Sequence, residues 1–218
     1  MTRRRILTTA AGGLAACLLL NKVMSAQVVI QKTSFLGGPD FDLAGIELVP
    51  LDTPEHQGAV KQILAEDAAL VAPLLPYSVL LVNHSTRKLL AVGVEYHWLD
   101  AGGDYGGMQS VITYFSEGAK VTPVGGIVLF TPSHAANLYL SLDAAKRRKV
   151  PAGVGITPST PLPTAVANEI AEITGPGPLP GYTKFRAAID CVVFEDYQYI
   201  GSSNAFQLIL RNHPEVHK

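Results

Sequence analysis

The chain is poor in cysteine and in charged residues. Only two of its 218 residues are cysteines, and 16% are Asp, Glu, Lys or Arg. So few cysteines exclude a disulfide-stapled scaffold, whereas a hydrophobic content of 48% supports a packed core and excludes a disordered chain. The sequence also lacks the GxSxG, HExxH, P-loop, GxGxxG and CxxC patterns. We therefore expect a protein that is not an enzyme and that has no cofactor.

The first 26 residues have the order of an export signal. Arginines occupy positions 3–5, an apolar run follows at 6–20, and small residues end the segment at Ala26. The string at 2–7 resembles the twin-arginine export pattern. We expect cleavage after Ala26 and an exported bacterial protein, periplasmic or extracellular.

Two alternative interpretations of this segment involve the membrane. The string Leu14–Cys17 resembles a lipobox, in which Cys17 would carry a lipid, but three leucines continue the apolar run beyond it. An uncleaved signal would act as an anchor, but the run at 6–20 is shorter than the ~20 residues that cross a bilayer. Membrane attachment is therefore expected only if Cys17 is lipidated or the signal stays uncleaved.

Removal of the signal makes the chain acidic. The segment holds four of the 17 Lys and Arg residues and no acid, so 13 basic and 18 acidic residues remain, a net charge of −5. This charge is unlike that of a nucleic-acid-binding protein, so we expect no nucleic-acid partner. Cys191, the remaining cysteine, alternates with Ile189 and Val193 and is expected to be a buried apolar residue.

The strongest β pattern lies at 76–100, where two apolar runs flank a polar turn. We interpret it as a long antiparallel hairpin at the centre of the domain. Alternate side chains of its second half are expected to face the core: Leu90, Val92, Val94, Tyr96 and Trp98. Glu95 and His97 share the other face and are candidates for an acid–base pair, although polar residues also suit a half-exposed sheet face.

The other segments are assigned by their alternation, prolines and glycines. Residues 27–40 are predicted to be a tether, and 41–218 a single β-sandwich domain. Further strands are expected at 41–50, 108–115, 125–132, 137–142, 182–195 and 197–201. A helix is expected at 54–69, with Asp52 or Thr53 as its cap and Pro54 at its first position. The Pro-rich insertion 151–181 contains a helical pattern at 164–174.

Three other polar groups are candidate ligand sites: Asp100 and Asp104 in the glycine-rich loop 100–107, the basic run Lys146–Lys149, and the pair His213 and His217. The two aspartates lack the spacing of a calcium loop, so a turn explains them more simply. The basic run is expected to be solvated. The two histidines straddle a proline, so no metal site is predicted there.

Two strings, Asn83–Ser85 and Asp190–Gly201, resemble exported bacterial proteins with an immunoglobulin- or fibronectin-like β-sandwich, a family of uncharacterised activity. The resemblance covers residues 76–201. It implies a mainly β fold, an antiparallel sandwich of about seven strands, which here lacks the cysteine pair of antibody domains.

These observations lead to an expected function. We expect an exported envelope or extracellular protein that binds another protein or an envelope component through loops or strand edges. The alternative is a hydrolase-like or carbohydrate-binding domain with its site between loop 100–107 and insertion 151–181.

Overall fold

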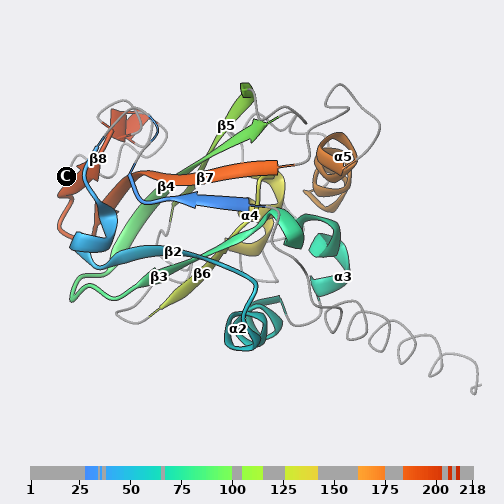
Figure 1. Ribbon diagram of the computed structural model, residues 1–218, viewed down its shortest axis with the longest axis horizontal. Helices are drawn as coiled ribbons and strands as arrows, with labels where there is room; N and C mark the ends of the chain where they lie inside the picture. Colours follow the sequence, from blue (N-terminus) through green and yellow to red (C-terminus); the bar gives the residue numbers. More distant parts are fainter. Residues whose placement is uncertain are drawn as a thin grey trace, which may run out of the picture.

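The computed structural model describes residues 28–33, 35, 38–64, 67–99, 105–114, 126–141, 162–174, 184–202, 206–207 and 210–211. These residues form two β-sheets that face each other, with helices against one of them (Figure 1). The strands therefore account for only part of the fold, and the sequence-based description as mainly β is incomplete.

The larger sheet, sheet A, has the strand order β1-β7-β4-β5, with β8 also beside β7. Its first strand, β1 (Val28–Gln31), runs parallel to β7 (Lys184–Phe194). The other pairs are antiparallel and join β7 to β4 (Leu89–Leu99), β4 to β5 (Tyr105–Tyr114) and β7 to β8 (Tyr199–Gly201). Sheet A is thus a mixed sheet.

The smaller sheet, sheet B, is antiparallel with the order β2-β3-β6. Its strands are β2 (Ile46–Pro50), β3 (Val79–Asn83) and β6 (Ile127–Phe130). Both faces of β3 are covered, because Val79 and Leu81 face sheet A whereas Leu80 packs against the helices. Such two-sided burial explains why β3 is apolar without interruption.

The space between the sheets holds the main core. Alternate residues of β4 and β7 enter it from sheet A: Val92, Val94, Tyr96, Trp98, Phe185, Ala187 and Ile189. They meet Val79, Leu81 and Phe130 on the inner face of sheet B. The Tyr96 hydroxyl donates a 3.0 Å hydrogen bond to the carbonyl of Phe130 and so joins the two sheets.

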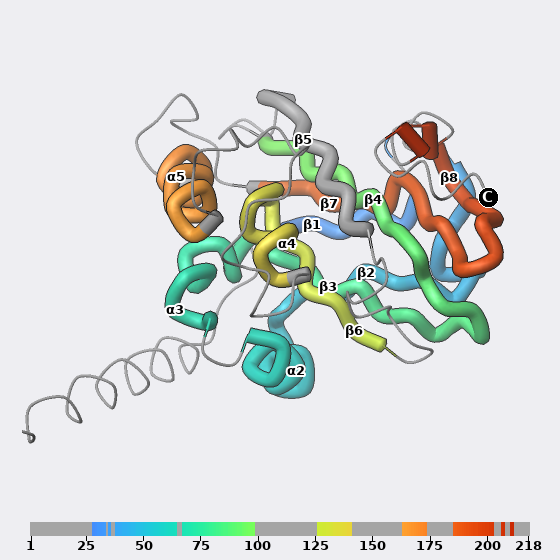
Figure 2. The backbone as a smooth tube through the Cα atoms, turned by 180° about the vertical axis from the view of Figure 1, so that it is seen from behind, coloured from blue at the N-terminus to red at the C-terminus, as the bar shows by residue number. Residues whose placement is uncertain are grey.

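Helices cover the outer face of sheet B (Figure 2). They are α2 (Pro54–Leu64), α3 (Ala68–Val71), α4 (His134–Ser141) and α5 (Leu162–Thr174), with 3-10 turns η1 (Phe41–Ala44) before β2 and η3 (Ala72–Tyr77) before β3. None of the helices in the described residues is long and apolar enough to span a membrane.

Local signals at the helices were interpreted correctly in two cases. The Thr53 hydroxyl accepts a hydrogen bond from the backbone N–H of His56, and Pro54 is the first residue of α2, as predicted. The helix within the Pro-rich insertion is also confirmed as α5. It buries Val166 in a second core, which lies between sheet B and the helices, so α5 docks on the domain.

The predicted hairpin at 76–100 is wrong. Both strands exist, but β3 lies in sheet B and β4 lies in sheet A, so the turn at 84–88 carries the chain between sheets. The pattern of two apolar runs around a polar turn specifies a chain reversal and not the partner of each strand. In β4, a register shift between Leu89 and Ala91 places Leu89 in the main core, with Leu90 beside Cys191 on the other face.

The strand predicted at 137–142 is also wrong, because 137–141 belong to α4. The alternation of its leucines was misleading. Ala135 and Ala136 are fully buried against the second core, and Ser133 caps the helix by accepting a hydrogen bond from the backbone N–H of Ala136. Alanine packing and a serine cap favour a helix here.

The predicted tether at 27–40 and the predicted strand at 41–50 need correction. Residues 28–31 form β1, whose Val28 is buried and pairs with Phe185. The strand begins only at Ile46, because 41–44 form η1 and Gly45 ends it with a positive φ of 75°. The predicted strands at 108–115, 125–132, 182–195 and 197–201 correspond to β5, β6, β7 and β8.

Replacement of Trp98 by alanine tests the core assignment. Trp98 is 9% exposed and meets Phe185 edge to face at 5.7 Å. Trp98→Ala is expected to lower the free energy of unfolding by about 3–5 kcal/mol in urea denaturation. Leu43→Ala, at a residue 88% exposed, serves as the control and should change it by less than about 0.5 kcal/mol. Equal effects of both variants would contradict the assignment.

Candidate functional site

A pocket of about 260 Å³ opens at the edge where β1 of sheet A faces β2 of sheet B. We call its apolar lining residues the floor and its polar lining residues the rim. The floor includes Val28, Ile30, Phe41, Leu48, Val49, Pro50 and Ile189. The rim comprises Gln31, Lys32, Asp42 and Glu47. An apolar concavity with a few polar groups at its mouth is the usual form of a binding site in a protein.

The rim is arranged by the turn η1. Asp40 caps it by accepting a hydrogen bond from the backbone N–H of Asp42, which places the Asp42 carboxylate 2.7 Å from Lys32 Nζ. The hydrogen bond that Lys32 Nζ donates to the Asp42 carboxylate, followed by the charge of Asp42, raises the pKa of Lys32. On β2, Glu47 Oε2 lies 3.5 Å from His84 Nε2.

A second candidate is a cluster of ionisable residues on the outer face of sheet A, where Glu95, His97 and Asp190 lie. The prediction of a half-exposed face is wrong here, since Glu95 and Asp190 are each only 6% exposed. The Phe35 ring stacks on His97 with 3.5 Å between ring centroids. Asp190 belongs to a bulge, because Gly93 pairs with Cys191 and the next residue of β4 pairs with Ile189.

The cluster is closely packed and incompletely hydrogen-bonded. Glu95 Oε2 lies 3.6 Å from His97 Nε2, beyond hydrogen-bond distance. Glu95 Oε2 and Asp190 Oδ1 are buried without a hydrogen-bond partner in the described part of the chain. Burial, and then the charge of Asp190, raises the pKa of Glu95 to about 7. Burial also raises the pKa of Asp190, opposed by a hydrogen bond with Ser202.

His97 and Cys191 favour their neutral forms in this cluster. Burial, followed by the charge of Arg186, lowers the pKa of His97. Burial, followed by the charge of Asp190, raises the pKa of the Cys191 thiol to about 12. Cys191 is fully buried, as predicted, but the bulge places it on the face opposite Ile189. Such a thiol is a poor nucleophile.

The geometry of the cluster suits proton binding better than catalysis. A pKa near 7 is the value that a general acid or base needs, but the carboxyl group must also reach a substrate. The Glu95 side chain is only 7% exposed. Among the described residues, no three His, Cys, Asp or Glu side chains are placed to hold a metal ion. We therefore regard the pocket between β1 and β2 as the candidate binding site.

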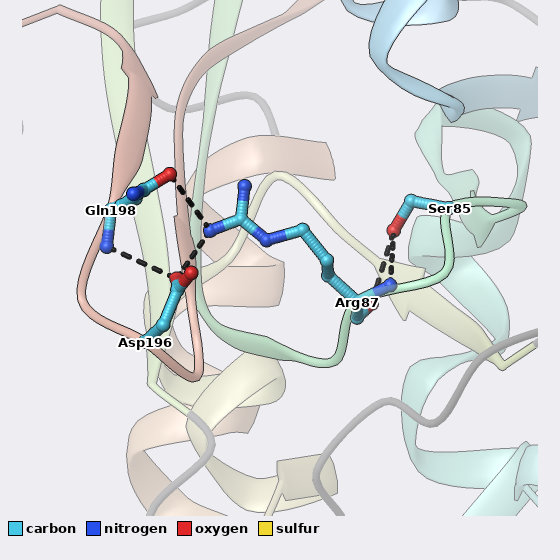
Figure 3. A network of polar contacts seen from close by, with 4 residues as sticks. All are labelled: Ser85, Arg87, Asp196 and Gln198. Carbon is cyan, nitrogen blue, oxygen red and sulfur yellow. Dashed lines mark hydrogen bonds and ion pairs between the residues drawn. The ribbon is translucent and has the colours of Figure 1, made fainter.

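The turn that follows β3 meets the turn between β7 and β8 (Figure 3). Arg87, in the turn after Asn83–Ser85, forms an ion pair with Asp196 in the turn between β7 and β8, and its Nη2 is 3.3 Å from Gln198 Oε1. The guanidinium also lies 3.8 Å above the centre of the Phe194 ring. This contact holds the two turns together.

A third polar network, at the start of α4, was missed from the sequence. Glu169 of α5 accepts hydrogen bonds from the Ser133 hydroxyl at 2.6 Å and from the backbone N–H of Ala135 at 3.1 Å. The Asn137 side chain bonds both backbone groups of Thr131. These bonds fix the helix end and satisfy the N–H groups of Ala135 and Ala136, so we assign the network a structural role.

Several predicted sites lie outside the described residues: Asp100 and Asp104, Lys146–Lys149, His213 and His217, and Cys17. The alternative site between loop 100–107 and insertion 151–181 falls largely outside them too. No protein family model, no curated protein and no solved structure matches this chain.

The pH dependence of stability tests the buried cluster. The folded protein keeps the Glu95 proton up to about pH 7, whereas an unfolded glutamate releases it near 4.5. The folded state therefore binds more protons between these values, and its stability falls as the pH rises through them. Relative to Glu95→Gln, the wild type should lose on the order of 1–3 kcal/mol between pH 5 and pH 8 in urea denaturation.

The matched control for this pH experiment is Glu172→Gln, at an exposed position of α5. It should follow the wild-type profile. Parallel profiles for the wild type and Glu95→Gln would show that Glu95 is ionised throughout the range.

Proposed function

We propose that this protein is exported to the cell envelope or beyond and binds another protein or an envelope component without catalysing a reaction. The observation that carries this proposal is the pocket at the open edge between β1 and β2, with its apolar floor and charged rim. Next to the lining residue Asp42, Leu43 of η1 is an apolar residue that is 88% exposed. Exposed apolar groups with a polar rim are typical of interaction sites.

The topology supports a binding role for this edge. Among the described strands, β1 pairs only with β7 and β2 pairs only with β3, so both strands have a second edge without a strand partner. Unpaired edges are sites at which other chains add to a sheet. The kinship with immunoglobulin-like sandwiches belongs to the proposal as well. It is supported by the two facing sheets and by the crossing of the chain between them at 84–88.

Site-directed photo-crosslinking tests the binding site. A photo-reactive residue at position 43, beside the pocket, is expected to form adducts with an envelope component when the protein is expressed in its own cell. The control carries the same photo-reactive residue at position 55, an exposed position of α2, and should form no adducts. Adducts from both positions, or from neither in a folded protein, would contradict the proposal.

Replacement of the signal arginines tests export. If the protein uses the twin-arginine route, Arg3→Lys together with Arg4→Lys should abolish its appearance in the periplasm, measured by fractionation and immunoblotting. Lys22→Arg, near the end of the same segment, should leave export unchanged. Normal periplasmic yield of the double variant would exclude this route.

A further inference from the structure

The size of the pocket indicates what enters it. Sites for small molecules usually measure ~300–1,000 Å³, whereas this pocket measures about 260 Å³. It also extends along two strands, β1 and β2, whose outer edges have no strand partner among the described residues. A space of this size and position suits a few side chains of an added strand better than a complete small ligand.

The alternation of β1 determines which side chains of an added strand would enter. Val28 and Ile30 face the core between the sheets, whereas Val29 points away from it and is exposed. Neighbouring strands share their alternation, so every second side chain of a strand beside β1 would face inward. These inward side chains would meet the apolar floor at Phe41 and Leu48.

The rim selects the charge of the occupant. Lys32 is the only basic residue among the described residues that line the pocket, and its amine already bonds Asp42 at 2.7 Å. Glu47 adds a further carboxylate to the rim. Asp40, the cap residue of η1, lies two residues before Asp42 and adds another. The rim therefore has an excess of negative charge. A lysine or arginine side chain can lay its apolar stem across the floor and bring its charge to these carboxylates.

Building on the proposed function, we infer that the binding partner supplies an extended strand that pairs with the edge of β1 opposite β7, where none of the described strands lies. Its inward side chains fill the pocket, with a lysine or arginine between two apolar residues and directed toward Glu47 and Asp42. The main-chain hydrogen bonds supply affinity and the inward side chains supply selectivity, as in other complexes formed by strand addition.

A synthetic peptide tests this inference. The probe is a peptide of roughly seven residues with threonine at alternate positions and valine, lysine and valine at the others. Fluorescence anisotropy with the full protein should detect its binding. Hydrogen exchange should slow at the backbone amides of β1 when the peptide is present. The same peptide with glutamate in place of lysine should bind at least about tenfold more weakly, because the rim is acidic.

Two controls distinguish strand addition from nonspecific binding of the peptide. The peptide methylated at alternate backbone nitrogens cannot pair with an edge and should not bind. On the protein, Glu47→Lys should weaken binding of the lysine peptide about tenfold, whereas Glu55→Lys on α2 adds the same charge elsewhere and should not. Unchanged melting temperatures for both variants confirm that they fold.

The outcomes also separate this inference from the proposed function. Equal binding of the methylated peptide overturns strand addition, and equal binding of the lysine and glutamate peptides overturns the selectivity of the rim. If position 43 forms crosslinks but none of the peptides slows hydrogen exchange in β1, the proposed binding function stands and the inferred strand addition is rejected. Failure of both experiments rejects both.

Discussion

The structure depends on the contact between its two sheets, and Tyr96 lies at the centre of that contact. Its ring is fully buried in the main core, and its hydroxyl reaches across to the carbonyl of Phe130 in sheet B. Burial raises the pKa of Tyr96 well above its ordinary value, so the hydroxyl keeps its proton and remains a donor. Phe130 is the last residue of β6, and α4 begins four residues later. The hydrogen bond from Tyr96 therefore also fixes the end of β6 from which the chain enters α4.

The local parts of the fold could be predicted from the sequence. Thr53 and Pro54 mark the start of α2 with their own side chains, and alternation in β4 and β7 identifies both strands. These signals are local because a cap or a pleat involves residues a few positions apart. Strand pairing is a property of remote segments, so β3 and β4 were assigned to one hairpin although each finds its partners elsewhere.

The candidate site was harder to predict than the fold, because its residues come from segments that are even more remote in the sequence. Glu95 and His97 carry no sign in their own strand that the face around them is covered, because Phe35 and Asp190 come from distant parts of the chain. The pocket was missed for a similar reason. It exists only because β1 and β2 end up as the edges of two different sheets. The capping network at α4 had a local sign in Ser133, but the role of Glu169 required α5 to be placed.

The pairing of β1 with β7 has a consequence for the order in which the protein is made. Val28 pairs with Phe185, so sheet A cannot be completed until most of the chain has been synthesised. At translation rates of 5–20 residues per second, β1 waits on the order of ten seconds for its partner strand. During this time its apolar residues are available to chaperones or to other chains. The strand that borders the pocket in the finished protein is thus also among the last to pair.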